Sequence, residues 1–213
     1  MLYYNQYVRA ESLDEAYTLY QKKNNFILAG MLWQKMRNRT MGTAIDLCAL
    51  GLDQVDETET EFRIGAYVSL RELETNERLN AYTEGAFRES VRHIVGVQFR
   101  NVATVGGSLW GRFGFSDVMT IFRALGAKVE LHHAGIMDLD EFVRLPRKTR
   151  DILVAVIVPK TGVSQPEKPV HRFSGADLRS CKESRRIRSS GGGNSSSGGS
   201  GTGSTRRAHR AYG

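Results

Sequence analysis

The residues best suited to chemistry gather in the stretch FRNVATVGGSLWGRFGFSD, which ends at Asp117. Its glycine pair, Gly106-Gly107, permits backbone conformations that a Cβ atom would block, and its N–H groups can then point into one anion-binding concavity. Thr104 and Ser108 add hydroxyl donors beside the pair. Asp117, nine residues beyond Ser108, is an acceptor suited to a ribose or ribityl hydroxyl. These residue types predict a loop that wraps a phosphate-containing ligand, although a glycine pair alone is also typical of an ordinary turn.

A second glycine lies near the start of the chain, between a predicted strand and a predicted helix. The apolar run 26–29 has the length of a strand, Gly30 follows it, and residues 32–36 can form one or two helical turns. This order places the start of a helix against a phosphate, and it is equally the order of a plain strand-to-helix connection. Each of two predicted lobes thus offers one glycine turn, and a cleft between lobes suits a dinucleotide.

Composition favours a globular part followed by a basic tail. The chain has 213 residues, an apolar fraction of 40% and no apolar run long enough to span a membrane. The segment 171–213 holds nine Lys or Arg residues against two acidic ones, so it carries the whole net charge of +7. A nucleic-acid-binding face is usually folded and concentrated. Nucleic acid is therefore not an expected partner of the globular part.

Cysteine content and the N-terminal sequence bear on the cellular compartment. The two cysteines, Cys48 and Cys181, are too few for a disulfide framework, and an Fe–S cluster normally takes four thiolates. The first fifteen residues lack the basic start and apolar core of a secretory signal. His132 and His133 are neighbours on a predicted strand and face opposite sides, so no metal site is expected. We expect a cytoplasmic protein.

Short strands alternate with capped helices, which predicts an α+β or α/β fold. Capping boxes begin at Ser12 and Ser69, and Ser116 caps a third helix that Gly126 ends. The segment 53–61 reads as a surface turn, and one helix is expected over 81–93. Strands are expected over 3–9, 26–29, 43–47, 62–66, 128–132 and 152–158, the last of them apolar enough to be buried.

Taken together, these segments resemble the FAD-binding (medium) subunit of molybdopterin hydroxylases, the xanthine dehydrogenase and carbon monoxide dehydrogenase group. The resemblance runs from Tyr7 to Lys160 and is strongest over RNVATVGGS, residues 100–108, with Ser116-Asp117 at the family's spacing. The supporting pieces are SLDEA at 12–16, ILAG at 27–30, RIGA at 63–66 and PRKT at 146–149.

The resemblance implies an α+β fold, a two-lobed FAD-binding domain of the PCMH/vanillyl-alcohol-oxidase-like type. Its lobes would span residues 1–55 and 56–160. Two segments would flank the FAD pyrophosphate, Asp117 would hold the ribityl chain or a nearby hydroxyl, and two apolar side chains would lie near the flavin. No residue is expected to be catalytic. The residues expected to bind FAD are Ala29, Gly30, Met31, Leu32, Trp33, Gln34, Ile94, Ala103, Thr104, Val105, Gly106, Gly107, Ser108, Asp117 and Leu153.

The sequence departs from the family pattern in three places. The first loop usually reads as two glycines and then Thr-Asp-Leu; here it is AGMLW, which resembles a variant in purine hydroxylase subunits of anaerobic bacteria. Ser108 stands where Asn is common. Residues 161–213 form a Gly/Ser/Arg-rich segment in place of the family's C-terminal domain, with too few aliphatic residues to bury a core. We interpret this segment as a disordered tail produced by a frameshift; a genuine flexible basic tail is the alternative.

The function implied by the resemblance is electron transfer in a purine- or xanthine-dehydrogenase-like molybdenum hydroxylase. Electrons would pass from Fe–S clusters through FAD to NAD⁺ or another acceptor, with FAD carrying the chemistry. The Fe–S and molybdopterin centres would belong to partner subunits, and this subunit would be active only in their complex. The alternatives are a truncated fragment without activity, which would expose apolar surface, and nucleic-acid binding through the basic tail.

Overall fold

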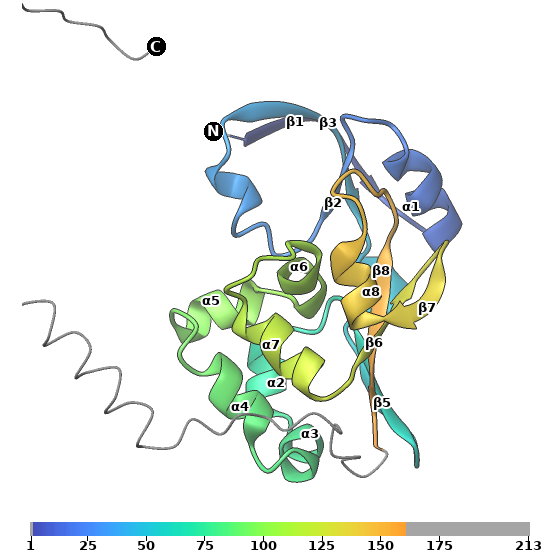
Figure 1. Cartoon of the computed structure of the whole chain (residues 1–213). Coiled ribbons are helices and arrows are strands. Elements are labelled where there is room, and N and C mark those ends of the chain that lie inside the picture. Colours follow the sequence, from blue (N-terminus) through green and yellow to red (C-terminus); the bar gives the residue numbers. More distant parts are fainter. Residues whose placement is uncertain (1, 161–213) are drawn as a thin grey trace, which may run out of the picture. The chain divides into compact units, whose positions relative to one another are not determined.

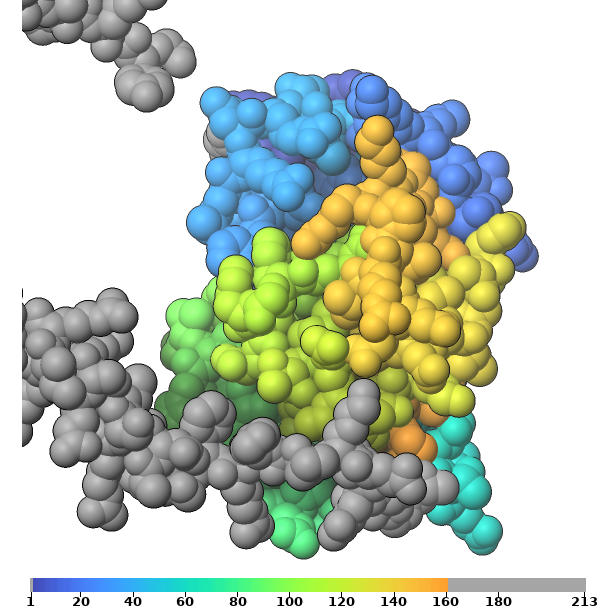
Figure 2. Space-filling view, in the orientation of Figure 1, coloured from blue at the N-terminus to red at the C-terminus, as the bar shows by residue number. Residues whose placement is uncertain are grey.

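The structure is a computed structural model that describes residues 2–160, and it contains two separate β-sheets (Figure 1). Figure 2 shows the same face of the molecule in a space-filling view. The structure confirms the α+β fold. The elements, in chain order, are β1 (Leu2–Arg9), α1 (Leu13–Tyr20), β2 (Phe26–Leu28), η1 (Gln34–Met36), β3 (Arg39–Asp46), η2 (Cys48–Leu50), β4 (Val55–Glu57), β5 (Glu61–Gly65), α2 (Leu70–Thr75), α3 (Glu77–Tyr82), α4 (Ala86–Val91), α5 (Val97–Val102), α6 (Val105–Trp110), α7 (Asp117–Ala124), β6 (Lys128–Leu131), β7 (Gly135–Asp138), α8 (Leu139–Arg144) and β8 (Leu153–Pro159).

The first sheet is small and parallel, with strand order β1-β3-β2. Tyr7 of β1 lies opposite Ala44 of β3, and Phe26 of β2 lies opposite the same residue from the other side. Helix α1 covers this sheet and contributes Ala16 to a buried cluster that includes Ile45. The strand β2 therefore ends in a fixed register at Leu28, directly before the Gly30 turn.

The second sheet has five antiparallel strands in the order β4-β5-β8-β6-β7. Its largest core cluster joins β5, β6 and β8 to side chains from α2, α4, α6 and α7, and Figure 1 shows these helices beside the sheet. Phe87 of α4 and Phe122 of α7 are fully buried, with ring centroids 5.2 Å apart. This core fixes the helices that carry the second predicted cofactor segment.

Strand β8 is buried on both faces, which confirms the expectation from its apolar sequence. Leu153, Val156 and Val158 belong to the large core of the second sheet. Val154, together with Ile152 just before the strand, packs into the cluster beneath the first sheet. One strand thus contributes to both cores, and its β-branched residues suit a position that water reaches from neither side.

The three predicted helix caps are confirmed. The Ser12 hydroxyl accepts a hydrogen bond from the Glu15 N–H at 3.1 Å. The Ser69 hydroxyl does the same for Glu72 at 3.0 Å, and the Ser116 hydroxyl accepts from Met119 at 3.2 Å. Each cap satisfies one N–H group that has no partner within its own helix.

Other predictions of local structure were wrong. The single helix expected over 81–93 is two helices, α3 and α4, because Gly85 between them has a left-handed backbone with φ of 81°. The predicted surface turn 53–61 contains strand β4, which pairs with β5. The glycine pair 106–107 lies inside helix α6, not in a loop. The predictions for the tail, residues 161–213, lie outside the described residues, and the lobe boundaries stay a prediction.

Candidate functional site

The Gly30 turn packs directly on the end of helix α5. A Cβ atom at Gly30 would overlap the carbonyl oxygen of Val102 and would lie 3.3 Å from the Cα atom of Ala103. Only glycine fits this approach of two backbones. The structure therefore brings together the two segments that the sequence predicts to flank a pyrophosphate, residues 29–34 and 103–107, although about seventy residues separate them in the chain.

The Gly30 turn offers backbone donors that no other described residue uses. The N–H groups of Gly30, Met31 and Leu32 make no hydrogen bond to an acceptor within residues 2–160. Met31 has a left-handed backbone with φ of 59°, which is uncommon for a residue with a side chain. Consecutive N–H groups around a left-handed residue form a concavity that binds anions. Unpaired donors and local strain together make this turn the candidate binding site.

The end of strand β2 is held in place by a tyrosine in the segment after β5. The Tyr67 hydroxyl donates to the carbonyl oxygen of Leu28, two residues before Gly30, and accepts from the N–H of Leu47 at 3.4 Å. Burial raises the pKa of the Tyr67 hydroxyl well above its ordinary value, so it stays a neutral donor. This contact positions the turn relative to the core that carries α6.

The glycine pair does not form the anion-binding concavity expected of it. Gly106 donates its N–H to the carbonyl oxygen of Ala66 at 2.8 Å, and Gly107 donates to the Thr104 hydroxyl at 3.1 Å. A Cβ atom at Gly106 would lie 2.8 Å from both Cβ and O of Ala66. Gly106 is therefore needed for the close packing of α6 against the segment after β5. The assignment of the pair to a cofactor stays a prediction.

The two predicted hydroxyl donors are occupied, whereas the predicted carboxylate acceptor is not. Ser108 donates its hydroxyl to the carbonyl oxygen of Thr104 at 2.8 Å, and the Thr104 hydroxyl caps α6. Asp117 begins helix α7, is exposed, and makes no hydrogen bond or ion pair with another residue of the range 2–160. Asp117 remains available to a ligand hydroxyl, and it also suits the positive end of a helix.

The two predicted flavin neighbours lie in different surroundings. Leu153 is buried in the large core, and Ile94 is half-buried at its edge. The Ile94 carbonyl oxygen accepts a hydrogen bond at 3.1 Å from Nη1 of Arg100, whose Nε and Nη2 donate to the Glu74 carboxylate at 2.7 and 3.2 Å. Val95, next to Ile94, has φ of 52° and is 77% exposed. A strained, exposed β-branched residue at this point is a further sign of a functional turn.

Sequence reasoning missed a group of basic side chains after the Gly30 turn. Lys35, Arg37 and Arg39 are exposed and form no ion pair with another described residue. Cations this close to unpaired N–H groups make the turn attractive to a diphosphate. The sequence signal that could have indicated this basic group is the run KMRNR, residues 35–39, directly after the loop.

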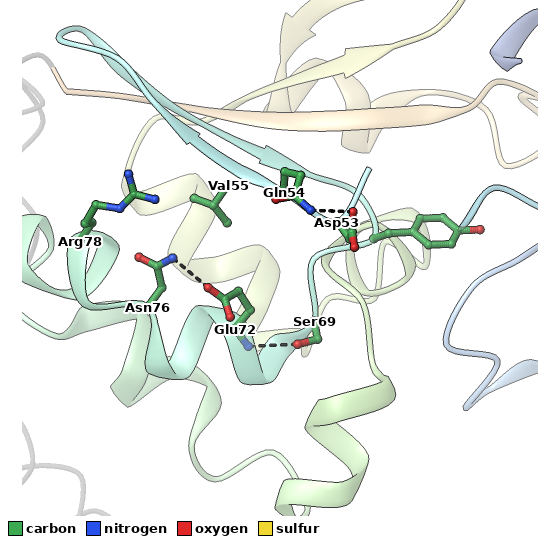
Figure 3. A pocket seen from close by; sticks show the side chains of 8 residues that line it. Asp53, Gln54, Val55, Ser69, Glu72, Asn76 and Arg78 are labelled. Carbon is green, nitrogen blue, oxygen red and sulfur yellow. Dashed lines mark hydrogen bonds between the residues drawn. The ribbon is translucent and has the colours of Figure 1, made fainter. Parts of the chain in front are cut away.

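The larger described cavity is elsewhere. It holds about 470 Å³ between the β4–β5 hairpin and helices α2 and α3 (Figure 3). Figure 3 shows that polar groups lining this cavity form hydrogen bonds within it. The Asn76 side-chain amide donates to the Glu72 carboxylate at 2.9 Å, and the Ser69 hydroxyl accepts from the Glu72 N–H as the cap of α2. None of the predicted cofactor residues lines it.

The described residues 2–160 contain neither a metal-binding cluster nor a membrane-spanning helix. No group of three or more His, Cys, Asp or Glu side chains in this range is placed to hold a metal ion. Nε2 of His132 instead lies 2.9 Å from the Asp14 carboxylate, and the His133 ring stacks on Tyr17. None of the helices in this range has the length and apolar character that crossing a membrane requires.

Comparison with known proteins identifies the family of this fold. Residues 3–161 match the model of the FAD binding domain in molybdopterin dehydrogenase, and the chain belongs to this family. The Escherichia coli K12 protein YgfM, described as uncharacterized, is 27% identical over 145 residues, which cover 66% of this chain and 54% of that protein. The chain thus spans about half the length of the curated relatives it matches.

Solved structures show the same fold. A cyanide-inactivated Cu,Mo-CO dehydrogenase gives a TM-score of 0.66 at 25% identity, over 75% of this chain and 60% of that one. The reconstituted CO dehydrogenase from Oligotropha carboxidovorans gives 0.64 at 25% identity, over 73% and 59%. Quinoline 2-oxidoreductase from Pseudomonas putida 86 gives 0.65 at 19% identity, over 75% and 59%, a likeness of fold alone.

Proposed function

We propose that this chain binds FAD with its diphosphate on the Gly30 turn and passes electrons as the flavin subunit of a molybdenum hydroxylase. The observation that carries the proposal is the turn itself, where three unpaired N–H groups begin at a glycine that packs on the end of α5, in a chain of an FAD-binding family. Helix ends and unpaired backbone donors are common sites for phosphate groups. The residues present therefore fit the group that the family binds.

Each part of the site has a role in this proposal. The N–H groups of residues 30–32 hold the diphosphate, and Lys35 and Arg37 attract its negative charge. Asp117 accepts a hydrogen bond from a hydroxyl of the sugar or the ribityl chain. Ile94 and Leu153 give the flavin ring an apolar border that excludes water. When bound, FAD supplies the electron-accepting chemistry, and the protein positions it and tunes its surroundings.

The wider reaction is part of the proposal. We infer that Fe–S and molybdopterin centres lie in partner subunits, because the described residues offer one exposed cysteine and no group of three or more His, Cys, Asp or Glu side chains placed to hold a metal ion. A purine- or xanthine-like substrate, NAD⁺ as the final acceptor and a cytoplasmic location are the finer proposals. The first loop, AGMLW, supports the purine hydroxylase variant of the family.

The test is flavin binding by the purified full chain. We expect the wild-type protein to bind FAD, measured by its visible absorbance after gel filtration and by calorimetric titration. Gly30→Ala places a Cβ atom against Val102 and should weaken FAD binding about tenfold or more, which corresponds to about 1.4 kcal/mol. Gly65→Ala is the matched control, since a Cβ atom there also overlaps a backbone carbonyl oxygen, that of Leu52, at a position outside the predicted cofactor residues.

Two results would overturn the proposal. A folded wild-type chain that binds no FAD would favour the alternative of a fragment without activity. Equal FAD affinity in Gly30→Ala and the wild-type protein, with unchanged thermal unfolding, would show that the turn does not hold the diphosphate.

A further inference from the structure

Strand β1 is an edge strand whose outer side is open. Among the described strands it pairs with β3 alone, from Leu2 opposite Arg39 to Arg9 opposite Asp46. Figure 1 shows β1 at the rim of the molecule, beside β3. Alternate N–H and C=O groups of an edge strand point away from its neighbour and can pair with a strand of another chain.

The exposure of β1 is unusual for a strand of a parallel sheet, because such strands are normally covered on both faces. The five central residues of β1, residues 3–7, are all exposed. Three of them are the tyrosines Tyr3, Tyr4 and Tyr7, with exposed fractions of 58%, 50% and 49%. Exposed aromatic side chains gathered at one place mark an interaction surface in a folded protein.

Strand β1 also lacks the features that prevent edge strands from pairing. Native edges are protected by short length, charged residues, proline or a β-bulge. This strand is eight residues long, carries no charge and no proline from Leu2 to Val8, and keeps the same register against β3 from one end to the other. Tyrosine also favours the extended conformation. The open edge is therefore suited to pairing with another strand.

The sequence of β1 is complementary to itself. Two copies of LYYNQYV, residues 2–8, that run in opposite directions about Asn5 place apolar side chains opposite apolar ones and aromatic rings opposite aromatic rings. The opposing pairs are Leu2 with Val8, Tyr3 with Tyr7, and Tyr4 with Gln6. Cross-strand aromatic pairs stabilise antiparallel strands. A two-fold symmetric contact requires a surface that is complementary to itself in this way.

Two of the tyrosine rings are already oriented. The Tyr7 hydroxyl donates to Oδ2 of Asp46 at 2.7 Å, and the Tyr4 ring lies edge-on to Phe26 with the centroids 6.5 Å apart. Side chains that are ordered before association lose less conformational entropy when they bind. Arg9, the one charged residue of β1, lies at the end of the strand and outside the self-complementary segment.

We infer that this chain forms a two-fold symmetric dimer in which the β1 edges of two copies pair antiparallel around Asn5. The pairing joins the three-stranded sheets of both copies into one continuous sheet. It uses the same edge on each copy, so association stops at two chains. One pair of strand edges buries less surface than a standard stable interface, and we expect a dissociation constant in the micromolar range.

The test is the mass of the full chain in solution, measured by sedimentation velocity over a series of protein concentrations. Asn5 lies on the two-fold axis and faces its own copy. Asn5→Lys and Asn5→Asp each place like charges opposite one another, so each should raise the dissociation constant of the dimer about fivefold or more. An equimolar mixture of the two variants should restore the dimer, because lysine then faces aspartate. Asn24→Lys is the matched control, since Asn24 is exposed and lies outside β1.

Three results would overturn the inference. The first is a wild-type chain that stays monomeric at about 1 mM. The second is a dimer with the same dissociation constant in both Asn5 variants, which would place the interface elsewhere. The third is a mixture of the folded variants that fails to restore the dimer, which would exclude the antiparallel register around Asn5. Circular dichroism checks that the variants are folded. FAD affinity, measured in parallel, tests the proposed function separately, because the pairing of β1 does not depend on the cofactor.

Discussion

Replacing Glu74 with glutamine should destabilise the fold and loosen the turn at Ile94. The Arg100 guanidinium is buried, with a side chain 5% exposed, and it joins α2 to α5 and to the Ile94 carbonyl oxygen. Glu74→Gln keeps the shape of the side chain, but it removes the charge and one of the two oxygens that accept from Arg100. The substitution leaves a buried cation without its counter-charge.

The size of the effect follows from this burial. Removing one partner of a buried ion pair costs about 3–5 kcal/mol. Two features place Glu74→Gln near the lower end: the Glu74 side chain is 12% exposed, and glutamine retains one acceptor oxygen. We expect a loss of about 3 kcal/mol in the free energy of unfolding. Arg100→Met should cost less, because Glu74 keeps its second partner, Arg71, at 2.8 Å.

The assay is equilibrium unfolding in urea at neutral pH. An unchanged m-value shows that the substitution has altered the free energy of unfolding and not the surface exposed on unfolding. Glu89→Gln is the control, because Glu89 and Arg92 form an ion pair whose side chains are 58% and 47% exposed. Such surface pairs contribute about 0–1 kcal/mol. The double variant of Glu74 and Arg100 should lose less than the sum of the single variants, by about 0.5–3 kcal/mol.

One result would refute this reasoning. If Glu74→Gln lost no more stability than Glu89→Gln, the buried pair would not hold α2, α5 and the Ile94 turn together.

Two further predictions concern packing and pH. Gly106→Ala should lower the free energy of unfolding by about 1–3 kcal/mol, because the new Cβ atom lies 2.8 Å from the backbone oxygen of Ala66. Gly114→Ala is the control and should change the free energy of unfolding by no more than about 0.5 kcal/mol. Equal urea midpoints for the two variants would contradict the packing account. Hydrogen bonds from Arg100 and Arg71 hold the pKa of Glu74 below its ordinary 4.5 despite partial burial. The stabilisation from Glu74 is thus complete above that value and is lost as the pH falls through the lower folded-state pKa. Urea midpoints measured from about pH 6 to pH 3 should fall less steeply in Glu74→Gln than in the wild-type protein.

The parts of the fold that could be predicted from the sequence are those determined by interactions between residues close together in the chain. The caps at Ser12, Ser69 and Ser116 depend on a residue three positions away, and β8 follows from a continuous apolar run. The prediction for the glycine pair was wrong because the contact that requires Gly106 is with Ala66, forty residues earlier in the chain. No local pattern distinguishes a glycine that makes a loop from one that lets a helix pack closely on another segment.

The candidate site divides in the same way. The order of strand, Gly30 and helix was visible in the sequence, and the structure finds unpaired N–H groups there. The packing of Gly30 on Val102 and of Trp33 on Phe113 joins segments about seventy to eighty residues apart, which no spacing rule reaches without the folded chain. The partners of Arg100 could not be predicted, because Glu74 and Ile94 become its neighbours only after α2 and α5 pack.

The position of β8 in its sheet has a consequence for synthesis on the ribosome. This strand pairs with both β5 and β6, yet it comes after every other described strand in the chain. Neither hydrophobic core can form completely until residues 152–158 have left the ribosomal exit tunnel. Until then, helices α2 to α7 expose to solvent the apolar side chains that later pack against β8. Contacts of such long sequence separation make folding slow.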